Sequence, residues 1–246
     1  MYCPQQLTYV IRSGDNLYQL AMYYRTTVPE ILSQNPGADP YNLQIGSSLT
    51  ICPGEEFRMP NQRPCPDPEA RTRLINDMRL RWSQHVYWTR MLLISIAHRL
   101  SDLGAVTARL MQNPDDIAEI FARYYSPDTA AAISRLLTEH LQIGSQLITD
   151  LRDGNTAGAD ALTRQWYINA DKMADAFAGI NPYYDRREMR DMLHRHLELT
   201  TQEVAARLAG DFSADIKAFD AVEEEALGMA DLFSAGIMLQ FPQMFC

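Results

Sequence analysis

Three of the five histidines recur at nearly equal intervals along the C-terminal part of the chain. They stand at positions 85, 140 and 196, which are 55 and 56 residues apart, and an apolar residue follows each of them. Imidazole nitrogen atoms bind divalent ions such as Zn²⁺, Fe²⁺ or Mn²⁺ when several of them meet. His85, His140 and His196 are therefore the first candidates for chemistry in this sequence.

A nine-residue block also recurs, once after each of these histidines. Its three versions are NPDDIAEIF from Asn113, NADKMADAF from Asn169 and EALGMADLF from Glu225. The blocks begin 28, 29 and 29 residues after the corresponding histidine. This spacing predicts three helical hairpins of one design, and so a three-fold internal repeat.

Hairpin geometry places each histidine level with the start of its block. Glycines at positions 154 and 210 lie 14 residues after the second and third histidines and can form the turns. A helix of that length and an equal return helix end at the starting height. We therefore expect three facing pairs, namely His85–Asn113, His140–Asn169 and His196–Glu225.

These pairs have two interpretations, and both stay open at the level of sequence. In the first, each pair is a buried hydrogen bond that locks one hairpin. In the second, the three histidines converge at one level of a helical bundle and bind a divalent metal ion together with Glu225. Against the second, no ExxH or HxxxH pattern supplies two ligands from one helical face.

The elements that must position these residues are helices. From Glu69 onward apolar residues recur at helical spacing, and the alternation typical of strands is absent. The expected helices span residues 69–100, 102–124, 130–151, 156–178, 186–208 and 213–240. Six helices with short connections predict an all-α domain over residues 69–246, an up-and-down bundle of three helical hairpins.

The first 52 residues have a different pattern. Leu7–Arg12 is a strand candidate of aromatic and β-branched residues, and Ser48–Ile51 is another. Asp15 stands at the N-cap position of a first helix. Thr27 and Glu30 have the spacing of a capping box at the start of a second helix. The predicted order is strand, helix, helix, strand, which is a small α+β module of βααβ type.

This stretch resembles a LysM domain, a βααβ module that binds glycans containing N-acetylglucosamine. The matching segments are Tyr9–Ile11, Ser13–Leu17, Leu20-Ala21, Thr27-Val28, Ile31-Leu32, Asn35-Pro36 and Leu43–Gly46. One departure is Asn16, where the family usually has Thr. The resemblance implies non-catalytic binding of peptidoglycan, spore cortex or a chitin-type glycan by residues 1–52.

The resemblance also implies where the sugar binds: a shallow groove between the loop after the first strand and the loop before the second. The glycan-binding candidates are therefore Gly14, Asp15, Asn16, Leu17, Tyr18, Tyr41, Asn42, Leu43, Gln44 and Ile45. Gly14 allows close approach of the backbone. Asn16 can bond the N-acetyl group, and Leu17 or Ile45 can contact its methyl group. Alternatively, Leu17 and Ile45 are core residues and Asp15 is only a helix cap.

Residues 53–68 form a proline-rich linker, PGEEFRMPNQRPCPDP, between the two parts. Cys3 precedes the first strand of the module and Cys52 follows the second. These ends meet in an antiparallel pair, so a Cys3–Cys52 disulfide fits an oxidising compartment, and two reduced thiols are the alternative. Cys65 and Cys246 can pair with each other or between chains.

Composition and the N-terminus limit the partners and the location. The net charge of −9 argues against a nucleic acid as the binding partner. The sequence contains no run of 18 apolar residues, so we expect no membrane-spanning helix. The N-terminus, MYCPQQLTYV, lacks the basic and apolar regions of a secretory signal peptide. Some LysM proteins of spore-forming bacteria also lack a signal. They are deposited on the forespore from the mother cell or released by lysis.

Three segments of the helical part, HVYWTRMLLISI, WYINAD and MLHRHLELT, weakly resemble uncharacterised helical domains of Gram-positive spore formers. No phosphate loop, GxSxG or paired-carboxylate signature is present, so we expect no enzyme and no cofactor. The predicted function is glycan binding that anchors the helical domain to a cell wall or spore surface, with homo-oligomers formed through that domain. The alternatives are a metal-binding helical bundle, or a structural assembly subunit cross-linked through Cys65 or Cys246.

Overall fold

The computed structural model describes residues 6–12, 15–39, 43–54, 67 and 69–245. The chain divides into two compact units, Met1–Pro66 and Asp67–Cys246, and each is described by itself. Among the described residues, no helix is both long enough and apolar enough to cross a lipid bilayer.

The N-terminal unit has the predicted βααβ order. Its elements are β1 (Leu7–Val10), α1 (Leu17–Tyr23), α2 (Val28–Gln34) and β2 (Ser48–Ile51). The two strands pair antiparallel, with Leu7 opposite Ile51 and Val10 opposite Ser48. Both helices pack on this small sheet around a hydrophobic core. The core residues are Ile11, Leu17, Leu20, Ala21, Tyr24, Ile31, Leu49 and Ile51.

The N-cap of helix α1 is one residue later in the sequence than predicted. The side chain of Asn16 accepts a hydrogen bond from the Gln19 amide at 2.9 Å, so Asn16 is the N-cap. The prediction that Asp15 caps this helix was wrong. Its carboxylate instead accepts hydrogen bonds from the Tyr9 hydroxyl and the Arg12 amide, both at 2.7 Å, and closes the turn after β1.

Helix α2 is tied to the sheet by the residue that follows it. The predicted capping box of Thr27 and Glu30 is present at its start. At its end, Asn35 Nδ2 donates to the Ile31 and Thr50 carbonyls, each at 2.7 Å, while Oδ1 accepts from the Thr50 amide at 2.8 Å. Asn35 therefore bonds the edge of β2 as a neighbouring strand would.

Cys52 takes part in a disulfide bond. The other three cysteines, Cys3, Cys65 and Cys246, lie outside the described residues. The pairing of Cys3 with Cys52 therefore stays a prediction.

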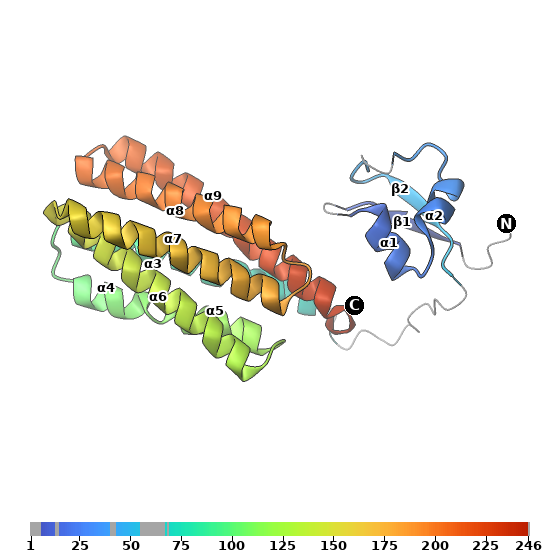
Figure 1. Ribbon diagram of the computed structural model, residues 1–246, viewed down its shortest axis with the longest axis horizontal. Helices are drawn as coiled ribbons and strands as arrows, with labels where there is room; N and C mark the ends of the chain where they lie inside the picture. The colour runs from blue at the N-terminus through green and yellow to red at the C-terminus, as the bar shows by residue number, and fades with distance from the viewer. Residues whose placement is uncertain (1–5, 13–14, 40–42, 55–66, 68, 246) are drawn as a thin grey trace. The chain divides into compact units, whose positions relative to one another are not determined.

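The C-terminal unit is a helical bundle (Figure 1). Its elements are α3 (Ala70–Ala97), α4 (Leu103–Leu110), α5 (Asn113–Ala122), α6 (Pro127–Asp153), α7 (Thr156–Ile180), α8 (Arg186–Ala209), α9 (Phe212–Gln240) and a short 3₁₀ helix, Pro242–Met244. Helices adjacent in sequence pack as pairs, α6 with α7 and α8 with α9, and α3 packs against α9. The predicted all-helical fold built from hairpins is confirmed.

The second helix predicted in this unit, residues 102–124, is two helices rather than one. Helix α4 ends at Leu110 and α5 begins at Asn113, with Pro114 in its first turn. Proline lacks an amide hydrogen and clashes with the preceding turn, so it favours a helix start over a helix interior. For the same reason Pro127, predicted as part of a break, is the first residue of α6, and Ser126 caps that helix.

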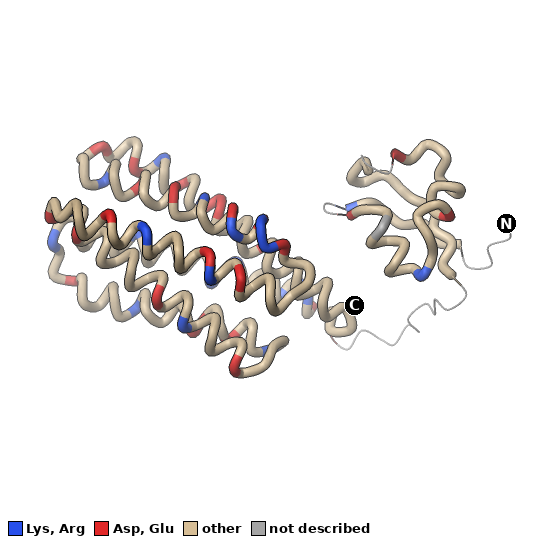
Figure 2. Tube along the Cα trace, in the orientation of Figure 1, with Lys and Arg blue, Asp and Glu red and all other residues tan. Residues whose placement is uncertain are grey.

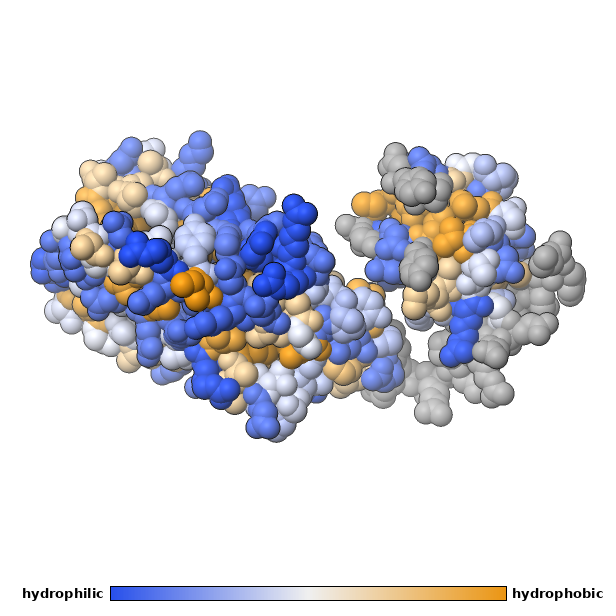
Figure 3. All heavy atoms as spheres, viewed as in Figure 1, coloured by the Kyte–Doolittle hydropathy of each residue, from blue (hydrophilic) through white to orange (hydrophobic). Residues whose placement is uncertain are grey.

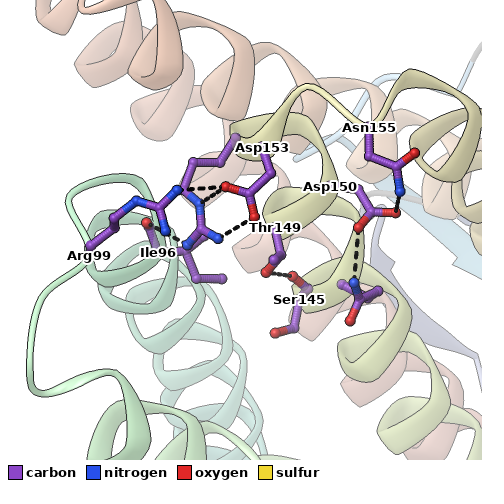
Figure 4. A network of polar contacts seen from close by, with 9 residues as sticks. Ile96, Arg99, Ser145, Thr149, Asp150, Asp153 and Asn155 are labelled. Atoms are coloured by element: carbon purple, nitrogen blue, oxygen red, sulfur yellow. Dashed lines mark hydrogen bonds and ion pairs between the residues drawn. The ribbon is translucent and has the colours of Figure 1, made fainter.

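Glycines form the turns of the second and third hairpins, as the sequence predicts. Gly154 and Gly210 both have φ of +76°, a left-handed conformation that ends α6 and α8. Beside the first of these turns, Arg99 donates to Asp153 at 2.7 Å, and Arg152 donates to the Ile96 carbonyl at 3.2 Å (Figure 4). These bonds join the α6–α7 turn to the end of α3.

Charged residues are spread along the bundle helices, with both signs interspersed (Figure 2). One group of them is buried. Arg90 on α3 pairs with Glu203 on α8 and with Asp215 on α9, which Arg207 also contacts at 2.6 Å. Burial raises the pKa of Glu203, and Arg90 opposes that shift. The group links three helices at one end of the bundle.

Replacing Asn35 tests the link between α2 and β2. Asn35→Ala removes three hydrogen bonds and leaves the Thr50 amide without its acceptor, so we expect a loss of about 2–4 kcal/mol in the stability of the module. Amide hydrogen exchange of the module in the full chain measures this loss. Ser33→Ala, an exposed change on α2, should shift stability by less than about 0.5 kcal/mol. Equal effects of the two substitutions would contradict the role given to Asn35.

Candidate functional site

The structure brings the three repeated histidines together inside the bundle. They lie on α3, α6 and α8, the first helices of the three hairpins. His85, His140 and His196 are only 3%, 3% and 4% exposed. Their ring centroids are 5.7 to 6.3 Å apart, and one nitrogen atom from each ring lies within 4.8 Å of the other two.

Each ring makes a hydrogen bond through Nδ1 to the start of the repeated block. His85 contacts Asn113 Oδ1 at 3.0 Å, and His140 contacts Asn169 Oδ1 at 3.2 Å. In the third hairpin, Nδ1 of His196 contacts a carboxylate oxygen of Glu225 at 3.0 Å. All three pairs expected from the spacing are therefore present. Glu225 lies behind His196 and is not one of the converging groups.

The two asparagines determine which nitrogen of their histidine carries hydrogen. Asn113 Nδ2 donates to the Arg81 carbonyl at 2.9 Å, and Asn169 Nδ2 donates to the Leu136 carbonyl at 3.1 Å. Each carbonyl lies one helical turn before the histidine of its hairpin. Because the amide nitrogen is committed to a carbonyl, the amide oxygen must face the ring and accept a hydrogen from Nδ1.

Burial favours the neutral form of His85 and His140, and a neutral ring with its hydrogen on Nδ1 has its lone pair on Nε2. Burial, with a smaller contribution from the nearby His196, lowers the pKa of His85 to about 3. Burial also holds the pKa of His140 well below its usual value, with His196 and His85 adding to the effect. Beside the third ring, Glu225 Oε1 is buried and has no hydrogen-bond donor among the described residues.

A small cavity of about 20 Å³ adjoins the three rings. The residue one turn after each histidine lines it, namely Thr89, Gly144 and Thr200. Thr200 Oγ1 donates to the His196 carbonyl at 2.9 Å, whereas Thr89 Oγ1 is buried without a hydrogen-bond partner among the described residues.

Gly144 lets a tryptophan approach the cluster. A Cβ atom at this position would lie 3.2 Å from the ring of Trp166. The Trp166 indole donates to the His140 carbonyl at 3.1 Å, and its ring lies 5.2 Å from the His140 ring. Trp166 thus fixes the turn of α6 that carries His140 and closes one side of the cavity.

A second candidate site is a pocket of about 490 Å³ in the N-terminal unit. It lies between the segment after α2 and the segment that leads into β2. The lining residues are Ile11, Asn35, Pro36, Gly37, Ala38, Asp39, Leu43, Gln44, Ser47, Ser48 and Leu49. Apolar side chains and polar groups of the backbone and the two serines meet there, which suits a small, partly polar ligand.

The predicted glycan-binding residues occupy several environments. Leu43 and Gln44 line the pocket. Leu17 is 2% exposed and packs in the core, which favours its core role, whereas Ile45 is 69% exposed. The side chains of Asp15 and Asn16 bond the backbone next to them. Gly14, Tyr41 and Asn42 lie outside the described residues, as does the side chain of Tyr18.

Comparison with known protein families decides the nature of the N-terminal unit. Residues 9–51 match the family described as LysM domain. The N-terminal module is a LysM domain. LysM domains are non-catalytic modules that bind glycans containing N-acetylglucosamine, such as peptidoglycan and chitin. The LysM match ends at residue 51, and neither a curated protein nor a solved structure matches the chain. Apolar residues gather on one visible face of the LysM domain (Figure 3).

The tautomers of the buried histidines can be measured by nitrogen NMR of the metal-free protein. We expect His85 and His140 to carry hydrogen on Nδ1, because an asparagine oxygen accepts from that atom in each hairpin. The exposed His98 serves as the control, and we expect it to show a mixture of the two tautomers, as an imidazole in water does. Hydrogen on Nε2 of either buried ring would contradict the assignment of the two amide groups.

Proposed function

We propose that the protein is a non-catalytic anchor, in which the LysM domain binds wall glycan and the helical bundle is the part held at the wall. The proposed location is either a cell wall or the surface of a spore. The observation that carries this proposal is the open pocket inside the matched LysM domain, between Asn35–Asp39 and Leu43–Leu49.

The chemistry of the pocket supports a sugar that carries an N-acetyl group. Leu43 provides a partly exposed apolar side chain for a methyl group, and the backbone from residue 36 to residue 39 provides amide and carbonyl groups. Ser47 and Ser48 add hydroxyl groups. A pocket of this kind binds through a few directed polar contacts and limited apolar burial.

Binding by one such open pocket is expected to be weak, on the order of micromolar to millimolar. Several modules that engage one polymer together would be retained far more strongly, because later contacts form at high effective concentration. Association of the chain through its helical bundle would supply those copies. Retention on a polymer should then exceed what binding of a short oligosaccharide suggests.

Blocking the pocket tests the proposal. Gly37 lines the pocket, and a Cβ atom added there meets no atom within 4 Å, so we expect a large side chain at this position to be tolerated and to obstruct the pocket. We expect Gly37→Phe to lower retention of the full chain on purified peptidoglycan at least about tenfold, a loss of about 1.4 kcal/mol in binding free energy.

The control places the same side chain elsewhere on the domain. Ser33→Phe lies on the exposed face of α2, outside the pocket, and should leave retention unchanged. A chain that starts at Glu69 should not be retained at all. Full retention of the Gly37 variant would show that the glycan binds elsewhere, and retention of the shortened chain would show that the bundle itself binds the wall.

A further inference from the structure

We propose that His85, His140 and His196 bind one divalent ion of the late first-row metals, for which Zn²⁺ is the reference, and that this ion locks the three hairpins together. The ligands are the three Nε2 atoms. This site lies in the helical bundle and is independent of glycan binding by the LysM domain.

The hydrogen bonds of the three histidines leave their Nε2 atoms available to a ligand. Asn113 and Asn169 hold the hydrogen of their histidine on Nδ1, so Nε2 of each ring presents a lone pair. Nδ1 of the third ring is likewise engaged, by Glu225. With all three rings neutral, three acceptors converge within 4.8 Å of one another in the bundle. A buried water has only two hydrogens and leaves one acceptor unmet, whereas a metal ion accepts all three lone pairs.

Each of the three histidines has a hydrogen-bond partner on its Nδ1 atom. Histidines that bind a metal usually donate their other nitrogen to an amide, a carbonyl or a carboxylate, which fixes the tautomer and the ring direction. All three histidines here have such a partner. Glu225, the one of these three partners with a carboxyl group, is partly buried and keeps one oxygen without a donor among the described residues. A carboxylate at this place would offset part of the charge of a divalent ion.

The distances between the three nitrogen atoms are also close to those of a metal site. Zn–N bonds of about 2.0–2.1 Å place three nitrogen atoms of a tetrahedral site roughly 3.4 Å apart. The nitrogen atoms here lie within 4.8 Å of one another, so binding requires only a small inward movement of rings that pivot on their Nδ1 hydrogen bonds. Each histidine belongs to a different hairpin, and the ion therefore cross-links all three.

The cavity indicates what the fourth ligand is. Its volume of about 20 Å³ holds one water molecule and excludes an organic substrate. Thr89 Oγ1 is buried there without a hydrogen-bond partner among the described residues, and it can bond a metal-bound water. A three-histidine ion whose fourth position is enclosed and occupied by water suits a structural role.

Metal titration of the full chain, free of tags and freed of metal by chelation, tests the proposal. With Co²⁺ as the probe, we expect one equivalent to produce the visible absorption of a tetrahedral site and Zn²⁺ to displace it. Zn²⁺ should also raise the melting temperature of the bundle. His140→Gln should abolish the absorption, and Glu225→Gln should weaken binding about 10- to 100-fold because it keeps the hydrogen-bond acceptor and removes the charge.

The matched control is His194→Gln, since His194 lies on the same helix as His196 but pairs with Asp171 near the surface. This variant should bind Co²⁺ like the parent chain. The proposal is overturned if the parent chain gives no tetrahedral Co²⁺ spectrum, or if binding survives His140→Gln. Should His140→Gln fail to fold, Glu225→Gln decides: unchanged affinity in that variant contradicts the proposal.

Discussion

The bundle depends on the orientation of two buried amide groups. Asn113 and Asn169 each give their nitrogen to the carbonyl one turn before a histidine and their oxygen to the ring itself. Each amide therefore ties two helices of a hairpin and sets the tautomer of its histidine in a single step. Burial then keeps those rings neutral, since an unpaired charge in the core would be costly.

The third hairpin varies this design, because Glu225 stands where the other two have asparagine. A carboxylate can accept the same hydrogen bond from Nδ1, so the ring keeps its direction, and the hairpin gains a partly buried carboxyl group. A third asparagine would leave no carboxyl group directly behind a ring. Glu225 places one there, which suits the cation of the proposed metal site.

Much of this arrangement could be predicted from the sequence, because the information lies in spacing. Equal intervals between the histidines and their blocks predict which residues face each other, and the two turn glycines determine the level. Local chemistry was harder. Apolar periodicity predicts one helix that continues through Pro114, but Pro114 lies in the first turn of a new helix, α5. Similarly, Asn16 caps α1 because Asp15 closes the turn before it. The cavity next to the histidines depends on side-chain packing around Gly144, which periodicity does not reveal.

The central claim is that three Nε2 atoms converge on one ion. Nitrogen NMR of the full chain loaded with ¹¹³Cd tests this most directly, because scalar coupling passes only through a metal–nitrogen bond. The account predicts one cadmium resonance coupled to Nε2 of His85, His140 and His196, and no coupling to His98 or His194. Coupling to fewer than these three rings, or through Nδ1, would contradict it.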